Sequence, residues 1–408
     1  MALEVCRVTG SKLTEVLTFG KQPLGNGFLL PQNFANEYFY EMSLGFSEES
    51  MMLQLIHQPS PEVMFHKEYA FFSSTSRNME LHFKNFAQSV IDSGYLQGKD
   101  PFVIELGCND GIMLKNFADR SIRHLGIEPS KNVADKANQI GVKTVTEFFS
   151  DELSEELVEL HGKADAFLAA NVMCHIPDIK SVVKGIKRLL KQSGVVMFED
   201  PYLGDIISRT SYDQIYDEHV FLFSALSVEY LFNLEGLQLI DVIPQNTHGG
   251  SMRYVLANEG VYKVSPAVEK LKQFEKAQGL NRLETFNNFR INVEKSKSQL
   301  LLLLEEISQD GKKIAGYAAT SKSTTILNYC GINSSLIEYI CDTTPIKQNK
   351  FSPGMHVPVR PYEFFSENPP DYAFLFAWNH LDEVMEKEQD FMNRGGKWIT
   401  HVPQVRIL

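Results

Sequence analysis

Hydrophobic residues recur along this chain with two alternating periods. Between residues 101 and 258, short apolar runs typical of buried strands alternate with segments that have apolar residues at helical spacing. The predicted strands are 102–104, 124–127, 166–169 and 194–198, and the predicted helices are 113–119, 132–140 and 179–191. Because strands that alternate with helices form parallel sheets covered on both faces, this region predicts an α/β fold.

The rest of the chain divides around this region. Residues 1–60 mix short apolar alternations with turn residues and predict a small, mainly β lobe, and residues 61–98 have helical spacing. Residues 262–310 are rich in Lys, Glu and Leu and poor in Gly, which predicts linking helices. A second alternation then predicts strands 313–315, 336–341, 372–377 and 398–401 and helices 324–329 and 381–393. The predicted domains are 1–60, an N-terminal lobe; 61–260, a ligand-binding α/β domain with a helical lead-in; 261–310, linking helices; and 311–408, a C-terminal α/β domain.

Composition narrows the function classes. The 408 residues include 39 Lys+Arg and 51 Asp+Glu, a net charge of −12. This charge argues against a surface that binds a nucleic acid polymer or anionic lipid, but it permits a local basic pocket. We expect no membrane association, since no apolar run approaches the roughly 20 residues that span a bilayer. Five scattered cysteines and no secretory signal predict a cytoplasmic protein, and we expect a monomer or weak dimer.

The sharpest motif is Glu-Leu-Gly-Cys-Asn-Asp-Gly at residues 105–111, between a predicted strand and a helix. Glycines at such a turn let the backbone approach a ligand. The acid Asp110 at this turn disfavours a pyrophosphate but tolerates a positive sulfonium. Glu128, at the end of the next strand, is placed to hold two ribose hydroxyls. The predicted cofactor-binding residues are Glu105, Gly107, Asn109, Asp110, Gly111, Glu128, Pro129 and Asn171. These features resemble the class I S-adenosylmethionine-dependent methyltransferases.

Three later segments carry groups suited to proton transfer or ligand positioning. His175 follows a predicted strand and either acts on substrate or only caps the next helix. Tyr216 and His219 share a face if their segment is helical, and they form either a proton-transfer pair or a satisfied polar knot in the core. Residues 246–254 contain two adjacent glycines, and they either position a ligand or form a tight turn.

Taken in order, these motifs resemble the sugar C-methyltransferases over nearly the whole chain. The matching segments are residues 105–111, 127–130, 171–178, 215–219 and 247–253, with 316–322, Asp342, 347–354 and 377–379 in the last lobe. The resemblance implies a class I Rossmann-like parallel sheet, a small N-terminal lobe and a second, C-terminal Rossmann-like lobe. It also implies S-adenosylmethionine-dependent C-methylation of a nucleotide-linked keto-deoxysugar, of the dTDP type, through an enolate.

The resemblance assigns roles to particular residues. The implied catalytic residues are His219, Tyr216, Glu218, His175 and Tyr69. We expect His219 to be the base, directly or through Tyr216, with Glu218 fixing its tautomer and His175 donating to the developing oxyanion. The predicted substrate-binding residues are His248, Ser251, Arg253 and Lys322. Lys322 opens a predicted helix and forms either an anion site or an ordinary solvated helix start.

Two departures from the family pattern matter. Asp217 stands where the family usually has the first His of a Tyr-His-Glu-His segment. The N-terminal lobe, which binds zinc through two Cys pairs in the family, keeps Cys6 but has Thr9, Ser47 and Ser50 at the other positions. His57 and His66 have the wrong spacing to replace them, so we predict that no zinc is bound.

Two alternative functions remain from the sequence. One is a methyltransferase on the same scaffold with another acceptor, by O- or N-methylation or on a non-nucleotide substrate. The other is a non-catalytic binding protein, which the joint presence of the predicted catalytic residues disfavours.

Overall fold

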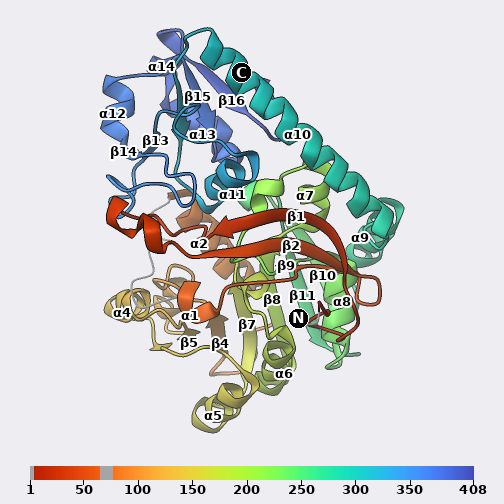
Figure 1. The fold of residues 1–408 in the computed structure, drawn as a ribbon. Helices are drawn as coiled ribbons and strands as arrows, with labels where there is room; N and C mark the ends of the chain where they lie inside the picture. The colour runs from red at the N-terminus through yellow and green to blue at the C-terminus, as the bar shows by residue number, and fades with distance from the viewer. Residues whose placement is uncertain (1–3, 65–76) are drawn as a thin grey trace.

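Three β-sheets organise residues 4–64 and 77–408, the part of the chain that this computed structural model describes (Figure 1). The middle of the chain forms a seven-stranded sheet, and the C-terminal lobe forms a six-stranded one. A four-stranded sheet of the N-terminal lobe lies between them in Figure 1, with β1 and β2 crossing the middle of the view.

The seven-stranded sheet has the order β10-β11-β8-β7-β4-β5-β6. Strands β6, β5, β4, β7 and β8 are parallel to one another. Strand β11 is antiparallel to β8, and β10, which pairs antiparallel with β11, runs again in the direction of β8. The strands are β4 (Phe102–Leu106), β5 (Arg123–Ile127), β6 (Thr144–Val145), β7 (Ala164–Ala170), β8 (Leu190–Pro201), β10 (Leu237–Gln245) and β11 (Ser251–Asn258). All five residues of β4 are buried, as expected for a parallel strand covered on both faces.

Helices cover both faces of this sheet. They are α1 (Pro61–Met64), α2 (Arg77–Asp92), α3 (Lys115–Ala118), α4 (Lys131–Gln139), α5 (Asp151–His161), α6 (Ile179–Leu189), α7 (Leu203–Arg209), α8 (Ala225–Asn233) and α9 (Pro266–Ala277). Helix α6 shows why they form: Ile179, Val182, Val183 and Ile186 recur at helical spacing and are all buried against the sheet. Its N-cap Asp178 accepts a hydrogen bond from the backbone N–H of Ser181 at 3.3 Å, which satisfies one free donor of the first turn.

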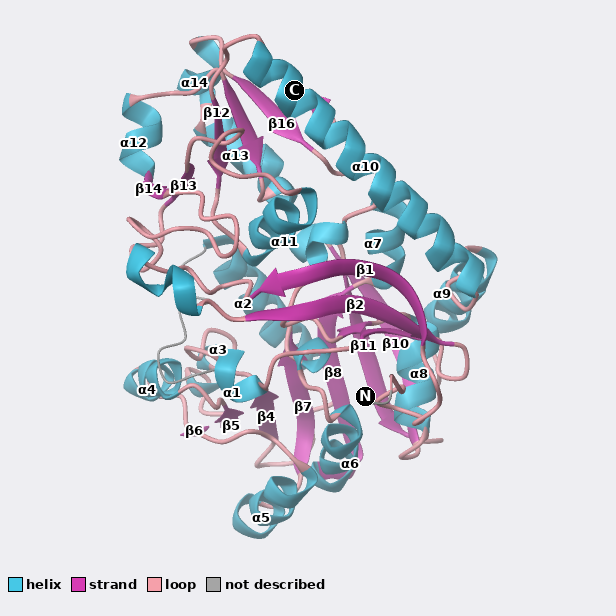
Figure 2. Cartoon of the chain, in the orientation of Figure 1, coloured by secondary structure: helices cyan, strands magenta, loops and turns pink. Residues whose placement is uncertain are grey.

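The C-terminal sheet has the order β14-β13-β12-β15-β16-β17, with only β17 antiparallel among its strands. Its strands are β12 (Ile314–Tyr317), β13 (Ile340–Asp342), β14 (Val359–Pro361), β15 (Tyr372–Leu375), β16 (Lys397–Thr400) and β17 (Arg406–Ile407). Its helices are α11 (Ser321–Cys330), α12 (Tyr362–Glu367), α13 (Leu381–Lys387) and α14 (Gln389–Asn393). The long helix α10 (Leu283–Gln309) runs along β1 and leads into this lobe (Figure 2).

The N-terminal sheet joins parts of the chain that are far apart in sequence. Its strands are β1 (Thr14–Pro23), β2 (Phe39–Ser47), β3 (Met52–Leu55) and β9 (Phe221–Leu222). Strand β9 directly follows His219, so the N-terminal lobe holds the end of the predicted catalytic segment through a strand pair. Phe46 of β2 also packs on Phe286 of α10, with ring centroids 4.5 Å apart.

The predicted elements match this fold except at four places. The segment 212–221 is not helical: it is a 3-10 turn at Tyr212–Gln214 followed by a second turn closed by the His219 N–H to Tyr216 O bond. The strand predicted at 336–341 begins only at Ile340, because residues 333–337 form a turn on the Asn333 carbonyl. The helix predicted at 381–393 is divided into α13 and α14, and that predicted at 113–119 is limited to α3. The α/β fold class and the second α/β lobe are confirmed.

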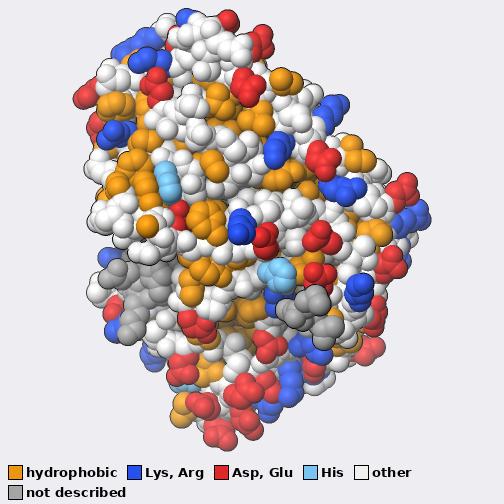
Figure 3. Space-filling model, viewed as in Figure 1, with side chains coloured by type: hydrophobic (Ala, Val, Ile, Leu, Met, Phe, Trp, Pro, Cys, Tyr) orange, Lys and Arg blue, Asp and Glu red, His pale blue; other side chains and the backbone are white. Residues whose placement is uncertain are grey.

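The surface agrees with the acidic composition. In Figure 3 acidic side chains gather at the lower tip of the molecule, over α5, whose sequence contains Asp151, Glu152, Glu155 and Glu156. Among residues 4–64 and 77–408, no helix combines the length and apolarity needed to cross a membrane.

Candidate active site

A cavity of about 380 Å³ lies where the three sheets meet. Its lining contains eleven residues that the sequence analysis named as candidate site residues. They are Gly107, Asn109, Glu128, Pro129, Asn171, His175, Tyr216, Glu218 and His219, with His248 and Lys322. The structure therefore brings the predicted cofactor, catalytic and substrate residues into one space. Tyr69, the remaining predicted catalytic residue, lies outside the described residues.

The cofactor end of the cavity is formed by the turn after β4. Gly107 has a φ of 64°, and a Cβ there would lie 2.3 Å from Cγ2 of Val172, so only glycine fits this position. The Glu128 carboxylate accepts hydrogen bonds from the N–H groups of Asn109 at 3.1 Å and Ser130 at 2.9 Å. These two bonds fix the carboxylate at the cavity wall, where its other lone pairs can accept from the two hydroxyls of a ribose.

The other predicted cofactor residues lie behind this turn. Glu105 and Asp110 are buried and do not line the cavity. Burial raises the pKa of Glu105, and the carboxylates of Glu128 and Asp110 add to the effect. Gly111 has a φ of 82° and packs against Val142 and Ala137. These residues shape the turn from inside, and their predicted contact with the cofactor stays a prediction.

The cluster of predicted catalytic residues is centred on His219. Its Nε2 lies 2.7 Å from Oη of Tyr216, and its Nδ1 lies 2.7 Å from the carbonyl oxygen of Gln214. A carbonyl can only accept, so Nδ1 carries the proton and Nε2 accepts from the tyrosine hydroxyl when the ring is neutral. The prediction that Glu218 fixes this tautomer is therefore wrong, because the backbone of Gln214 already occupies Nδ1.

His175 completes this cluster. Its ring lies 5.3 Å from that of His219, nearly parallel at 20°, and ligand atoms of Cys174, His175 and His219 all lie within 4.8 Å of one another. Burial lowers the pKa of His175 to about 4. Burial holds the pKa of His219 well below its usual range, and the neighbouring His175 lowers it further. Both imidazoles are therefore neutral near pH 7, as a base and a neutral hydrogen-bond donor must be.

Residues 212–219, here called the catalytic loop because they contain the predicted catalytic Tyr216 and His219, are held in place by the C-terminal lobe. The indole N–H of Trp378 donates to Oδ2 of Asp213 at 2.6 Å, and Nε2 of His401 lies 3.6 Å from Oδ1 of the same carboxylate. Asp213 is fully buried, and His401 and Lys322 help keep its pKa below the usual range despite the opposing effect of burial. Because Asp213 directly precedes Gln214, this contact sets the position of the carbonyl that holds His219.

Two lysines of the C-terminal lobe form the opposite wall of the cavity. Nζ of Lys322 donates to Oδ1 of Asn379 at 3.0 Å, and Nζ of Lys347 donates to the carbonyl of Ala319 at 2.8 Å. Burial lowers the pKa of both lysines, partly offset by acidic neighbours. Lys347 was not a predicted site residue, although it begins the segment 347–354 that matches the resembling family, because that match gave the lysine no role.

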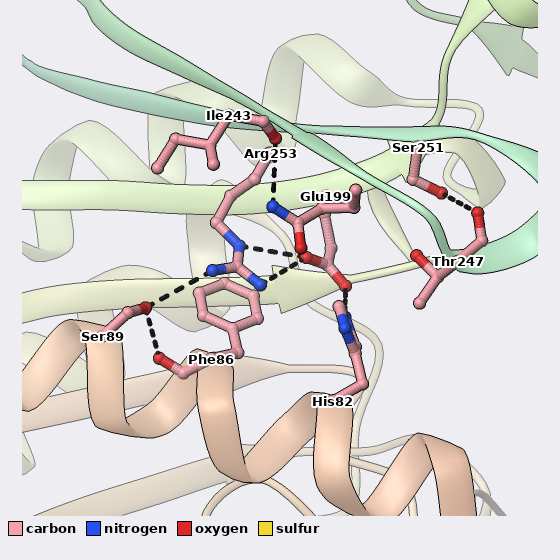
Figure 4. A network of polar contacts seen from close by, with 9 residues as sticks. His82, Phe86, Ser89, Glu199, Ile243, Thr247, Ser251 and Arg253 are labelled. Carbon is pink, nitrogen blue, oxygen red and sulfur yellow. Dashed lines mark hydrogen bonds and ion pairs between the residues drawn. The ribbon is translucent and has the colours of Figure 1, made fainter.

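Arg253 and Ser251 do not line the cavity. Figure 4 shows the polar contacts that each of them makes instead. The guanidinium of Arg253 donates twice to Oε2 of Glu199, at 3.0 and 2.8 Å, and lies 3.5 Å from the centroid of the Phe86 ring. His82 pairs with the other carboxylate oxygen of Glu199. The hydroxyl of Ser251 donates to the Thr247 carbonyl at 3.1 Å. The geometry gives Arg253 and Ser251 a supporting role, and their direct substrate contact stays a prediction.

Several lining residues carried no recognisable signal in the sequence. They are Asn26 from the N-terminal lobe, Met79 and Phe83 from α2, and Phe148 after β6. Their places depend on how the lobes pack.

The four positions that hold zinc in the resembling family come together in the N-terminal lobe. Sγ of Cys6 lies 3.4 Å from Oγ of Ser50, and the hydroxyls of Thr9 and Ser47 also hydrogen-bond the sulfur. The amide of Gln54 donates to the same sulfur at 3.2 Å. One thiol among neutral hydroxyls does not match the Cys- and His-rich donor sets of structural zinc sites, so these residues do not fit the metal.

The fold and the site define the class of protein. A parallel sheet in which β11 alone is reversed, so that β10 at the edge runs again in the direction of β8, with a glycine turn after β4 and an acid after β5, is the arrangement of a class I S-adenosylmethionine-dependent methyltransferase. Residues 83–242 match the model of a methyltransferase domain, residues 246–403 that of a C-methyltransferase C-terminal domain, and residues 6–65 that of a putative zinc binding domain.

A full-length relative shows the family. The chain is 31% identical over 409 residues to the C-methyltransferase NovU of Streptomyces niveus, which covers 100% of this chain and 97% of the relative. This chain belongs to the C-methyltransferase family and is an S-adenosylmethionine-dependent C-methyltransferase. The residues at the turn after β4 fit that cofactor, since the Gly107 backbone is open to a ligand and Glu128 is fixed beside it.

Other similarities cover the methyltransferase domain alone. A ubiquinone biosynthesis O-methyltransferase of Acinetobacter baylyi is 28% identical over 184 residues, 44% of this chain and 67% of the relative. Among solved structures, magnesium protoporphyrin IX methyltransferase of Synechocystis with bound S-adenosylhomocysteine has a TM-score of 0.35 at 13% identity, covering 44% of this chain and 83% of that one.

Proposed function

We propose that this enzyme methylates a carbon beside the ketone of a nucleotide-linked deoxysugar, through an enolate. The observation that carries the proposal is the neutral Tyr216–His219 pair, 2.7 Å apart, inside the cavity that the cofactor turn also lines. A hydrogen on a carbon beside a ketone is only weakly acidic, so its removal needs a positioned base. Methylation of oxygen or nitrogen also releases a proton, but from the heteroatom itself and without a developing enolate oxygen to stabilise.

The residues divide the work of this step. Nε2 of His219 receives the proton, directly or through Oη of Tyr216, and the Gln214 carbonyl on Nδ1 stabilises the imidazolium that forms. His175 is neutral and donates to the oxygen on which negative charge develops. S-adenosylmethionine supplies the methyl group that the enolate carbon takes.

The opposite wall suits the rest of such a substrate. Lys322 and Lys347 bring two ammonium groups into the wall opposite the cofactor turn, although the protein carries a net charge of −12. Ammonium groups of this kind bind phosphate oxygens as point charges. We assign the diphosphate of the nucleotide to these lysines.

The test is an incubation of the purified enzyme with methyl-labelled S-adenosylmethionine and a panel of nucleotide-linked ketosugars in D₂O. With a ¹³C-methyl donor we expect a product about 15 mass units heavier with the label on carbon, and deuterium entering the unreacted substrate at the position beside the ketone. The matched control is the same nucleotide sugar with the ketone reduced to an alcohol, which cannot form an enolate and should remain unmethylated. Label found on oxygen or nitrogen would overturn the proposal.

A further inference from the structure

We propose that Asn26, contributed by the N-terminal lobe, is a positioning residue for the carboxylate of Glu218 in the active site. This inference rests on the proposed function, since Glu218 lines the cavity of that reaction and is one of its predicted catalytic residues. Nδ2 of Asn26 donates to Oε1 of Glu218 at 2.9 Å, and both side chains line the cavity. The two residues are 192 positions apart in the sequence, so only the packing of the lobes brings them together.

The turn that carries Asn26 is held from two sides. The N–H of Gly25 donates to both oxygens of Asp217, at 3.1 Å each, so the turn is tied to the catalytic loop. The carbonyl of Gly25 accepts from Oγ1 of Thr324 at 2.8 Å, which ties the same peptide to α11 of the C-terminal lobe. The turn is itself closed by a bond from the Gly27 N–H to the Leu24 carbonyl at 3.1 Å.

Close packing shows that this contact is built into the fold. A Cβ at Gly25 would lie 2.7 Å from Oδ1 of Asp217 and 3.1 Å from Cβ of Ser321. No side chain fits at that position without moving the catalytic loop or α11. We call the contacts of Gly25 with Asp217 and Thr324 the Gly25 clamp. Because this clamp fixes the peptide of Gly25, it also fixes the backbone of the next residue, Asn26, closely enough to hold a hydrogen bond.

The chemistry of an amide suits this role. Nδ2 can only donate, so Asn26 orients one oxygen of Glu218 without removing its charge. The neighbouring Asp217 does not compete for this donor, since its oxygens already accept from Gly25. Burial raises the pKa of Asp217 above its usual range, and the neighbouring Glu218 adds to this effect.

The test compares N26A and N26D with N33A and N33D, all in the full chain. Asn33 lies on the same lobe but is exposed and outside the active-site cavity, so it controls for the substitution itself. N26D keeps the shape of the side chain but replaces the donor with a second carboxylate facing Glu218, whereas N26A removes the donor without adding charge. A positioning role therefore requires a loss in both variants. The readouts are kcat, the KM for the ketosugar, the Kd for S-adenosylhomocysteine, and the rate of deuterium exchange beside the ketone.

We expect both Asn26 variants to lower kcat and the exchange rate together by about 10- to 100-fold, the range for loss of one hydrogen bond to a charged group. The ketosugar KM and the cofactor Kd should change by less than threefold, and the Asn33 variants should match the wild type. A kcat within twofold of wild type in N26D, or a loss confined to KM, would overturn the inference while leaving the proposed function intact. A wild-type enzyme without exchange on any ketosugar would overturn the proposed function first, and the inference with it.

Discussion

The seven-stranded sheet and the C-terminal sheet of this molecule each have a loop with the same hydrogen-bond pattern, one after β4 and one after β12. The first sheet contributes an acidic group to the cavity and the second contributes lysines. After β4, the N–H of Asn109 donates to Glu128 at the end of the neighbouring strand at 3.1 Å. After β12, the N–H of Ala319 donates to Asp342, at the end of its neighbouring strand, at 2.7 Å. In both cases a residue of the first loop has a positive φ, 48° at Asn109 and 72° at Ala318.

The similarity extends to the second oxygen of each acid. Glu128 accepts from the N–H of Ser130 at 2.9 Å, and Asp342 accepts from that of Thr344 at 2.7 Å. The difference lies in the groups added around the anchor. The edge of the seven-stranded sheet contributes the acid Glu128 to the cavity lining and no lysine. The edge of the C-terminal sheet contributes Lys322 and Lys347. One backbone device thus serves a cationic cofactor at one edge and, in our proposal, an anionic substrate handle at the other.

The largest effect should come from the residue between the two edges. H219A removes the proposed base, so we expect kcat to fall by at least about 1,000-fold, within the range for general base catalysis. The Kd for S-adenosylhomocysteine should stay within twofold, since His219 is separate from the turn after β4. Isothermal titration and steady-state kinetics measure both, with H124A as a control away from the cavity. Retained turnover would remove His219 as the base.

The matched pair E128A and D342A tests whether the two anchors have separate ligands. Loss of the Glu128 carboxylate should weaken S-adenosylhomocysteine binding by about 10- to 100-fold, because charged hydrogen bonds contribute roughly 1.5–3 kcal/mol each. D342A should leave that affinity unchanged. Equal weakening by both substitutions would break the comparison, and an unchanged affinity in E128A would refute its ribose role.

Removing the positive charge of Lys322 should weaken binding of the nucleotide sugar and leave cofactor binding unchanged. We expect K322M to raise the ketosugar KM by about tenfold, equivalent to 1.4 kcal/mol, with the cofactor affinity unchanged. The effect should shrink at high ionic strength, because salt screens the attraction between an ammonium and a phosphate. The exposed Lys313 supplies the control K313M. An equal loss toward a sugar without its nucleotide would contradict the assignment of Lys322 to the diphosphate.

Lowering the pH should reduce kcat/KM by a smaller factor than these substitutions. A base must be neutral to accept a proton, and burial holds the pKa of His219 well below its usual range. The rate should therefore fall only below the ordinary histidine pKa of about 6.5. At pH 5.5 kcat/KM should keep more than half of its value at pH 7.5, where an unshifted histidine would leave about a tenth. Circular dichroism at each pH checks that the fold persists, and a limb centred near 6.5 would contradict the burial argument.

The sequence predicted the acidic edge far better than the rest of the cavity. Gly107 and Glu128 are recognisable because a single strand–turn–helix unit places both, and local spacing then fixes their geometry. Asn26 and the anchor of Asp213 on Trp378 depend on contacts between residues 192 and 165 positions apart, which no local pattern records. Lys347 lies in a segment that matches the family, but only the packing of the lobes places it in the cavity. The sequence paired Tyr216 and His219 only on the condition that their segment is helical. They lie together although it is not, since a tight turn also brings residues i and i+3 together.

The smallest expected effect tests the lobe that joins the two edges, which holds the Gly25 clamp. We expect less than 0.1 zinc per chain and no change in Tm on adding EDTA, because Cys6 is the one thiol among Thr9, Ser47 and Ser50. T9C/S47C/S50C is the matched variant: it should bind one zinc per chain, since Sγ of Cys6 already lies 3.4 Å from Oγ of Ser50. Stoichiometric zinc in the wild type, or loss of activity in EDTA, would show that the clamp depends on a metal, and packing alone would then no longer explain how the two edges are held together.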